Sequence, residues 1–395
     1  MSIGLIDLII LLAAAQGFFL SVLIFHKHGQ LFANRFLVAL ILLYSLLLLN
    51  LLIGDVDFSE TYYHLVPFIV GLAFFMIPLH YLYAKYLMQR TGRFNPSDWL
   101  HFVPFLLWEG FSLVGIFAWP DRTRFWARLI GSAPQEVGFI LFHWLIIFQG
   151  GLYMFITIHA LHRYSRDIKA VFSSTEKIRL DWLTYITYMA LAVIIIFFIE
   201  NLFLLGGINL TGNFTLSSVL VAVYVYAIGY LGLFKSEVFA LPGIAASLRR
   251  LPELTTPASR ETDFSAGSQE KYEKSGLTPE KADEYKKQLL DLMEKEAPYL
   301  EEDLTLGSLA DRLSISPHNL SEVINTGLGQ NFFDFVNHYR VESAKDDLTD
   351  PKKQHLKILA VAYEAGFNSK SSFYAIFKKH TGLTPAEYRS RFGPK

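Results

Sequence analysis

Seven apolar segments, each about 20 residues long, constrain this chain more than any other feature of its sequence. A helix of that length crosses the hydrocarbon core of a bilayer, and inside lipid each backbone N–H and C=O must be hydrogen-bonded within its own helix. Composition supports this interpretation, because 52% of the residues are hydrophobic and only 18% are charged. We therefore predict a seven-helix transmembrane domain in residues 1–240, with spans at residues 3–25, 32–53, 63–86, 99–118, 137–159, 182–204 and 214–234.

The basic residues of the connecting loops predict how these spans are oriented. Ten Lys or Arg residues lie in the loops of one side, at positions 27, 35, 85, 90, 93, 163, 166, 169, 177 and 179. The loops of the other side have three, Arg122, Arg124 and Arg128. The positive-inside rule then places the N-terminus outside and everything after Phe234 in the cytoplasm, although the three Arg residues of the fourth loop depart from the rule.

The character of the chain changes after the last apolar segment. Residues 241–275 are rich in Ser, Thr, Glu, Arg and Pro and have few large apolar side chains, as flexible linkers do. A charged helix is then predicted from Thr278 to about Lys295, with apolar side chains on one face. This helix either packs on the C-terminal domain or dimerises as a coiled coil, and its few heptads favour packing.

Residues 358–380 have the pattern of two short helices joined by a tight turn. Apolar residues at helical spacing mark the first helix, and Gly366 follows where a left-handed residue is needed. Ser369 is a good N-cap for the second helix, which has a buried face of Phe373, Ile376 and Phe377. Such a pair is a helix-turn-helix, whose second helix can enter the DNA major groove.

The residues around this pair resemble the second helix-turn-helix of AraC-type transcription regulators. The resemblance is carried by Gly366 with Phe367, Ser369, Phe373, Phe377 with Lys378, Gly382, Thr384 with Pro385, and Tyr388 with Arg389. It implies a second copy upstream, and a shift of 53 positions places Ser369 on Ser316, Phe373 on Leu320 and Gly382 on Gly329. We therefore predict a cytoplasmic double helix-turn-helix domain over residues 276–395, with motifs at residues 306–326 and 358–380 and one longer helix, 332–348, between them.

The same resemblance implies which side chains contact DNA. We expect readout by the upstream helix through His318, Asn319, Ser321, Glu322 and Asn325, and contacts by the second unit through Lys370, Ser371, Tyr374, Lys378, Lys379 and Arg389. Residues 352–395 contain nine Lys or Arg and two Glu, a net charge of +7, which suits phosphate binding. Residues 301–351 contain three basic and ten acidic residues, a net charge of −7, so the upstream motif should bind phosphate poorly alone.

Three ionisable residues inside the predicted spans are candidates for a ligand site that opens to the outer side: Glu109, His143 and Glu200. The alternative is that these side chains only hold helices together. The chain has no cysteine, and no nucleophile elbow, phosphate loop or metal-binding His pair accompanies these residues. We therefore expect no catalytic residue, no metal and no cofactor.

Together these features predict an all-α, multi-pass protein of the bacterial inner membrane that binds double-stranded promoter DNA and regulates transcription. The lipid bilayer and DNA are the expected partners, an unidentified small molecule is the expected signal, and RNA polymerase and a second copy of the chain are further candidates. Two alternatives remain open. One is a membrane transporter or enzyme with a fused DNA-binding domain, which would show flux or turnover without DNA, and the other is a DNA tether that senses nothing.

Overall fold

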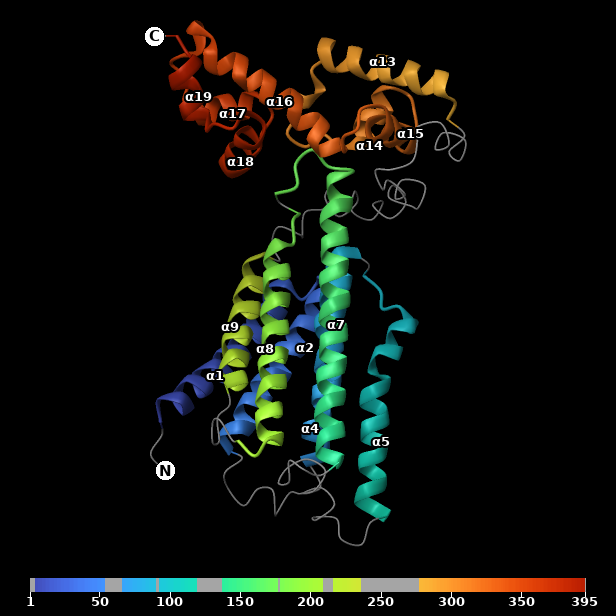
Figure 1. The fold of residues 1–395 in the computed structure, drawn as a ribbon, viewed down its shortest axis with the longest axis vertical. Helices are drawn as coiled ribbons and strands as arrows, with labels where there is room; N and C mark the ends of the chain where they lie inside the picture. Colours follow the sequence, from blue (N-terminus) through green and yellow to red (C-terminus); the bar gives the residue numbers. More distant parts are fainter. Residues whose placement is uncertain are drawn as a thin grey trace. The chain divides into compact units, whose positions relative to one another are not determined.

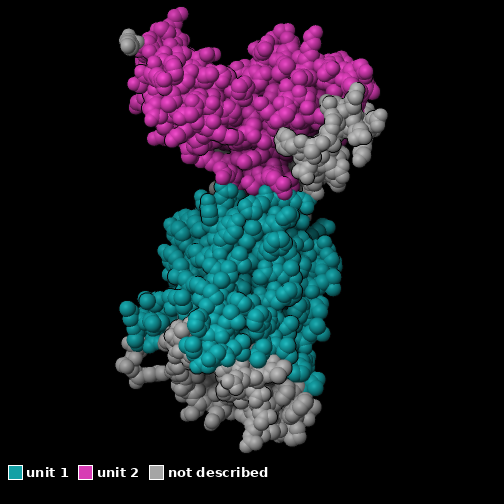
Figure 2. Space-filling view, in the orientation of Figure 1, with its two compact units in different colours: residues 1–163, 180–245 teal, residues 164–179, 246–395 magenta. Residues whose placement is uncertain are grey.

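The computed structural model describes residues 4–53, 66–89, 92–118, 137–176, 178–208, 216–235 and 277–394. Within these ranges every regular element is a helix, apart from one isolated β-bridge between Phe172 and Thr305. The chain divides into two compact units, which Figure 2 colours teal and magenta. Unit 1 comprises Met1–Arg163 and Leu180–Ala245, and unit 2 comprises Tyr164–Arg179 and Ala246–Lys395. The predicted linker, residues 241–275, lies outside the described residues.

Unit 1 is a bundle of long apolar helices (Figure 1). Its described helices are α1 (Leu5–His28), α2 (Phe32–Ile53), α4 (Val66–Gln89), η1 (Pro96–Phe102), α5 (Val103–Ala118), the greater part of α7 (Val137–Lys169), α8 (Asp181–Leu205) and α9 (Leu216–Lys235). α1 packs against α2 and α9, α2 also contacts α4, and α8 contacts α9.

Five helices among the described residues are long and apolar enough to cross a membrane: α1, α2, α7, α8 and α9. The predicted spans 63–86 and 99–118 correspond to α4 and α5, which are not among these five. α5 has 16 residues, about 24 Å at 1.5 Å per residue, whereas the hydrocarbon core is about 30 Å thick. Its expected first turn is instead part of the 3-10 helix η1, which Asn95 caps and Pro96 begins. The prediction of seven spans is therefore supported for five of them.

Small residues allow the helices of unit 1 to approach closely, as helices in lipid commonly do. A Cβ added at Gly17 of α1 would overlap Ser45 Oγ of α2 and lie 3.0 Å from Val225 Cγ1 of α9. A Cβ added at Gly232 of α9 would lie 2.5 Å from Leu37 Cδ2 of α2. The contacts of α1, α2 and α9 thus depend on positions without a side chain.

We expect Gly17→Ala to destabilise unit 1 by about 1–3 kcal/mol, because the added methyl group overpacks a filled contact. Gly151→Ala is the matched control, since a Cβ at Gly151 of α7 meets nothing within 4 Å. Thermal unfolding of the full chain in detergent, followed by circular dichroism, measures both. Equal melting temperatures for the two variants would contradict the proposed close approach.

Unit 2 contains two helix pairs joined by one long helix (Figure 1). α13 (Pro279–Lys295) and η5 (Pro298–Leu300) precede the first pair, α14 (Leu306–Arg312) and α15 (Pro317–Glu322), and α15 continues through one π-helical turn, η6 (Val323–Gly327). The long helix is α16 (Phe332–Thr349). After it come η7 (Pro351–Lys353), the second pair, α17 (Ile358–Glu364) and α18 (Lys370–Thr381), and finally α19 (Pro385–Phe392).

The same local signals form both helix pairs. Ser316 Oγ accepts a hydrogen bond from the Asn319 N–H, and Ser369 Oγ accepts one from the Ser372 N–H, each at 3.1 Å, so both second helices start at a serine cap. The turn between the helices needs a left-handed residue in each pair. Gly366 has φ +84° in the second pair, and Ser314 takes that conformation, with φ +56°, at the corresponding place in the first.

Each helix pair has its own hydrophobic core, and α16 belongs to both. Phe332, Phe335 and Val336 of its first half pack with the buried residues of α14 and α15. Val341, Ala344 and Leu348 of its second half pack with those of α17 and α18. α16 therefore determines how the second helices of the two pairs, α15 and α18, are placed relative to each other.

Candidate functional site

A buried arginine lies in α16 where its two cores meet. The side chain of Arg340 is 1% exposed and donates from Nε to Tyr299 O (2.7 Å) and from Nη2 to Glu301 O (2.7 Å). Its guanidinium also lies over the Phe367 ring of the second core, 5.9 Å from the centroid. Burial lowers the pKa of Arg340 to about 10, while Asp303 and Glu302 act to raise it, so the group stays charged at neutral pH. Arg340 thereby joins the turn before α14 to the second helix pair.

The first two turns of α18 present the polar side chains expected at a DNA interface. Lys370 and Ser371 are exposed, and Tyr374 is half-buried one turn later. The Lys370 ammonium lies 5.5 Å from the centre of the Tyr374 ring, a cation–π contact that aligns the two side chains. In a helix-turn-helix, the N-terminal residues of the second helix are those that meet base edges.

The basic residues at the end of α18 and in α19 differ in the contacts that their side chains make. Lys378 is exposed, whereas the Lys379 ammonium lies 2.9 Å from the Asp334 carboxylate of α16. Burial acts to raise the pKa of Asp334, but hydrogen bonds from Lys379 and Asn331 and the Lys379 charge lower it below its usual value. Arg389 points inward, with Nη1 donating to Leu356 O (2.7 Å) and with Nε and Nη2 buried without a partner among the described residues. Lys378 is thus better placed than Arg389 to meet a phosphate.

The upstream helix presents less of its polar face than the sequence indicates. Ser321 is 5% exposed, and its hydroxyl accepts a hydrogen bond from Asn325 Nδ2 at 3.1 Å. His318, Asn319 and Glu322 are half-buried. Asn325 lies in the π-helical turn η6, which changes the register of the face that α15 begins. His318 and Asn319, in the first turn of α15, are therefore the residues of this group best placed to reach a base edge.

Comparison with known proteins identifies the C-terminal region. Residues 309–391 match the family model described as "Helix-turn-helix domain". An uncharacterized HTH-type transcriptional regulator of Staphylococcus aureus (strain COL) is 37% identical over 91 residues, which are 23% of this chain and 12% of that protein. The HTH-type regulator YijO of Escherichia coli (strain K12) is 36% identical over 89 residues, 22% of this chain and 30% of YijO. The C-terminal domain of AraT, a response regulator from Geobacillus stearothermophilus, is 28% identical, with a TM-score of 0.25, over 31% of this chain and 92% of that structure.

These matches establish an AraC-type helix-turn-helix domain at the C-terminus, with relatives among HTH-type transcriptional regulators. The chain spans only a small part of the length of these relatives, 12% of the S. aureus protein and 30% of YijO. The resemblance to AraC-type regulators is thus confirmed for the domain that contains α14 to α19.

The three ionisable residues expected to form a ligand site lie against three different helices. Both carboxyl oxygens of Glu109 on α5 are buried without a hydrogen-bond partner among the described residues, next to Gly71 of α4. The His143 ring on α7 lies 5.8 Å from the Phe197 ring of α8. Glu200 on α8 accepts hydrogen bonds from the N–H (3.0 Å) and hydroxyl (2.6 Å) of Ser217, and so caps the first turn of α9. Glu200 is thus paired with Ser217, whereas the Glu109 carboxyl group has no hydrogen-bond partner among the described residues.

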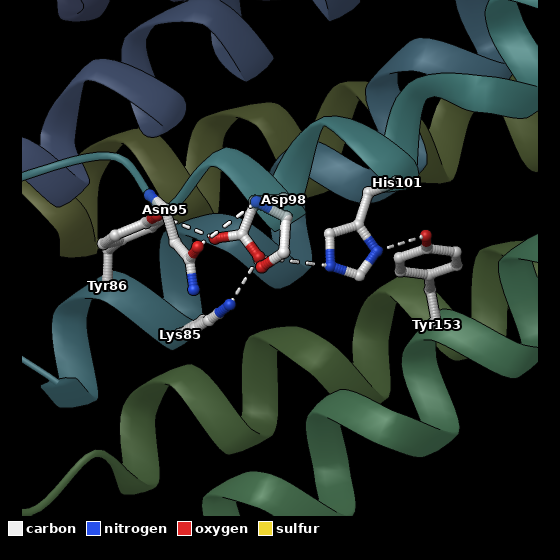
Figure 3. Close-up of polar contacts among 7 residues, drawn as sticks. Lys85, Tyr86, Asn95, Asp98, His101 and Tyr153 are labelled. Atoms are coloured by element: carbon white, nitrogen blue, oxygen red, sulfur yellow. Dashed lines mark hydrogen bonds and ion pairs between the residues drawn. The ribbon is translucent and has the colours of Figure 1, made fainter.

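Figure 3 shows a buried polar network in unit 1 that no sequence pattern predicted. The Asp98 carboxylate is 2% exposed and accepts hydrogen bonds from Lys85 Nζ (2.5 Å) and the Tyr86 hydroxyl (2.7 Å). His101 Nε2 lies 3.6 Å from the same carboxylate, and His101 Nδ1 is hydrogen-bonded to the Tyr153 hydroxyl (2.8 Å). The network joins α4, η1 and α7, so it holds the connection between α4 and α5 in place. Within the described residues, no group of three His, Asp or Glu side chains is arranged to hold a metal ion.

A second buried set involves His80 of α4. Its Nδ1 is 2.7 Å from the Tyr224 hydroxyl of α9, and its Nε2 is 3.0 Å from Thr187 Oγ1 of α8. Both ring nitrogens are therefore paired, and the imidazole links three helices. Sequence position alone does not show this role, because the two partners are more than 100 residues away in the chain.

We expect Asp98→Asn to destabilise unit 1 by about 3–5 kcal/mol, because it leaves the Lys85 ammonium without its anion in a largely buried place. Thermal unfolding in detergent measures this loss. The matched control is the double variant Lys85→Met with Asp98→Leu, which removes both charges and should restore most of the lost stability. A double variant as unstable as Asp98→Asn would show that the ion pair is not the source of the effect.

Proposed function

We propose that this chain is a membrane-embedded, sequence-specific DNA-binding transcription regulator of a bacterial inner membrane. The observation that carries this proposal is the presence, in one chain, of a helix-turn-helix domain at residues 309–391 and five helices apolar enough to cross a bilayer. The loops on the same predicted side of the membrane as the C-terminal domain contain more Lys and Arg than the loops of the other side. This excess supports a cytoplasmic position for unit 2, where promoter DNA is accessible.

In this proposal, α15 and α18 enter successive major grooves on one face of the duplex. Their connection through a single rigid helix, α16, supports this role, because recognition helices on one side of DNA must be spaced about one helical turn, roughly 34 Å, apart. The net charge of +7 in residues 352–395 favours the second pair as the source of phosphate affinity. The first pair, in a region of net charge −7, then contributes readout more than affinity.

We expect Lys378→Ala to weaken binding to all duplexes alike and to reduce the salt dependence of log K by about one unit, as loss of one phosphate contact does. Lys370→Ala should instead change the preference at one or two base pairs, by about 1–3 kcal/mol, because Lys370 lies in the first turn of α18. Fluorescence anisotropy of the full chain in nanodiscs, with a duplex identified by chromatin capture, measures both effects.

The control for this pair is Lys379→Ala. The Lys379 ammonium already pairs with the Asp334 carboxylate at 2.9 Å, so Lys379→Ala should reduce the salt dependence of binding less than Lys378→Ala does. A duplex of the same length and shuffled sequence separates specific from nonspecific binding. Identical binding profiles for the Lys370 and Lys378 variants would contradict the division of roles, and equal affinity of the unaltered chain for both duplexes would contradict the proposed function.

We further propose that unit 1 detects a small molecule near Glu109. The support is the burial of both Glu109 carboxyl oxygens without a partner among the described residues, since an unpaired polar group in an apolar bundle is costly and is retained at functional sites. A ligand with a hydrogen-bond donor would satisfy this group. It would change promoter binding only to the extent that it binds two packings of unit 1 with different affinity.

We expect Glu109→Gln to abolish the transcriptional response to the inducing condition without lowering the stability of unit 1. His143→Gln tests the contact of the His143 ring with Phe197. Glu200→Gln should instead lower the stability of unit 1, because it weakens the hydrogen bonds to Ser217 at the start of α9. Ser217→Ala is the matched control for Glu200, because it removes the hydroxyl that this carboxylate accepts from. A promoter fusion assayed at equal protein levels, with thermal unfolding in parallel, measures all four, and a normal response by Glu109→Gln would exclude the site.

A further inference from the structure

The end of α7 and the segment that follows it are part of unit 2. Residues 164–179 cluster with the C-terminal residues, and Val171, Phe172, Ser173 and Thr175 are all less than 9% exposed. The backbone forms the isolated antiparallel bridge of Phe172 with Thr305. In it the Ser173 N–H donates to Leu304 O (3.2 Å) and the Leu306 N–H donates to Val171 O (2.9 Å). This segment, which we call the α7–α8 loop (residues 170–179), is therefore part of the fold that contains the helix-turn-helix pairs.

The base of the α7–α8 loop satisfies buried polar groups of α16. Ser173 O accepts hydrogen bonds from Asn337 Nδ2 (3.0 Å) and Arg340 Nη1 (3.3 Å), and Ser173 Oγ accepts one from Arg340 Nη2 (3.1 Å). Asn337 and Arg340 are each 1% exposed. Because buried polar groups without partners are costly, these contacts fix the loop to the centre of unit 2.

The tip of the same loop lies on the start of α18. Asn368 Nδ2 donates to Ser174 Oγ (2.6 Å), and the Glu176 carboxylate accepts hydrogen bonds from the hydroxyls of Ser369 and Ser371. Ser369 is the N-cap of α18, and Ser371 is its second residue. The positive end of the helix dipole also favours a carboxylate at this position.

We infer that the α7–α8 loop is a self-inhibitory element, in which Glu176 occupies the end of α18 that DNA needs. The inference rests on the proposed function. Phosphates and base edges approach a recognition helix at its N-terminal turn, and a carboxylate there both fills the position and repels phosphate. DNA binding therefore requires that Glu176 leave Ser369 and Ser371.

The position of the loop in the chain also provides a direct connection to unit 1. α7 precedes the loop, α8 follows it, and both are apolar enough to cross a membrane. A change in the packing of α7 against α8 would move the loop, and the carboxylate with it, without involving residues 236–276. The base of the loop braces unit 2, and only its tip competes with DNA, so the two roles can be separated by substitution.

The test is the affinity of the full chain, in nanodiscs of phosphatidylethanolamine and phosphatidylglycerol, for its specific duplex and for a shuffled duplex. If nine molecules in ten hold the docked loop, Glu176→Ala should bind the specific duplex about tenfold more tightly. Glu176→Asp keeps the charge but is one methylene shorter, so it should also bind more tightly, by at least about threefold. Thermal unfolding should show a loss of no more than about 1.4 kcal/mol in either variant, the free energy that corresponds to a tenfold docking ratio, because Glu176 is exposed and supports no buried core.

The matched control is Asp291→Asn, which removes one negative charge from an exposed ion pair with Lys295 on α13. It should change the affinity by less than about twofold, as a screened surface charge does. An affinity gain by Asp291→Asn equal to that of Glu176→Ala, or unaltered affinity of Glu176→Asp, would overturn the inference and leave only a general charge effect. Failure of the proposed function is distinguishable, because the unaltered chain would then bind the shuffled duplex as well as the specific one.

Discussion

The buried guanidinium of Arg340 is the interaction on which the architecture of unit 2 depends. Its partners among the described contacts are carbonyl oxygens and one hydroxyl, contributed by the turn before α14 and by the α7–α8 loop, and Phe367 of the second core lies against its face. A charge that is 1% exposed is tolerated only when its donors are satisfied, so each of these segments must be in place together. The geometry of α15 and α18, and hence of any surface offered to DNA, follows from that requirement.

The parts of this structure that follow from sequence are those specified by neighbouring residues. Ser316 and Ser369 cap their helices through N–H groups three residues away, and Gly366 takes the left-handed conformation that its turn requires. The helices α1, α2, α7, α8 and α9 also follow from sequence, because the length and apolar composition of each lie within its own segment. The other two predicted spans correspond to α4 and α5, and the start of the second of them differs locally, because the Asn95 cap begins a 3-10 helix, η1, before α5.

The parts that do not follow from sequence are pairings between distant residues. Asn368 meets Ser174 across 194 positions, and His80 meets Tyr224 across 144, so no local pattern could reveal either contact. Tertiary contacts that no local pattern reveals also decide how the candidate DNA-binding residues are placed. The resemblance to AraC-type regulators suggests Ser321, Lys379 and Arg389 as DNA contacts. In the structure Ser321 is buried, Lys379 pairs with Asp334, and Arg389 donates to Leu356 O. The carboxylate on α18 comes from a loop that sequence reasoning assigned only to the membrane domain.

The membership of residues 164–179 in unit 2 has a consequence for topology that does not depend on counting charges. In the membrane-embedded chain that we propose, two segments that fold into one compact body lie in the same aqueous compartment, so the chain between Arg179 and the start of α13 crosses the bilayer an even number of times. Among the described residues, α8 and α9 are the two helices in that interval apolar enough to do so. In the same proposal α8 and α9 insert as a pair. Unit 2 can be completed only after both have been synthesised, because Phe172 precedes them in the chain and its bridge partner, Thr305, follows them.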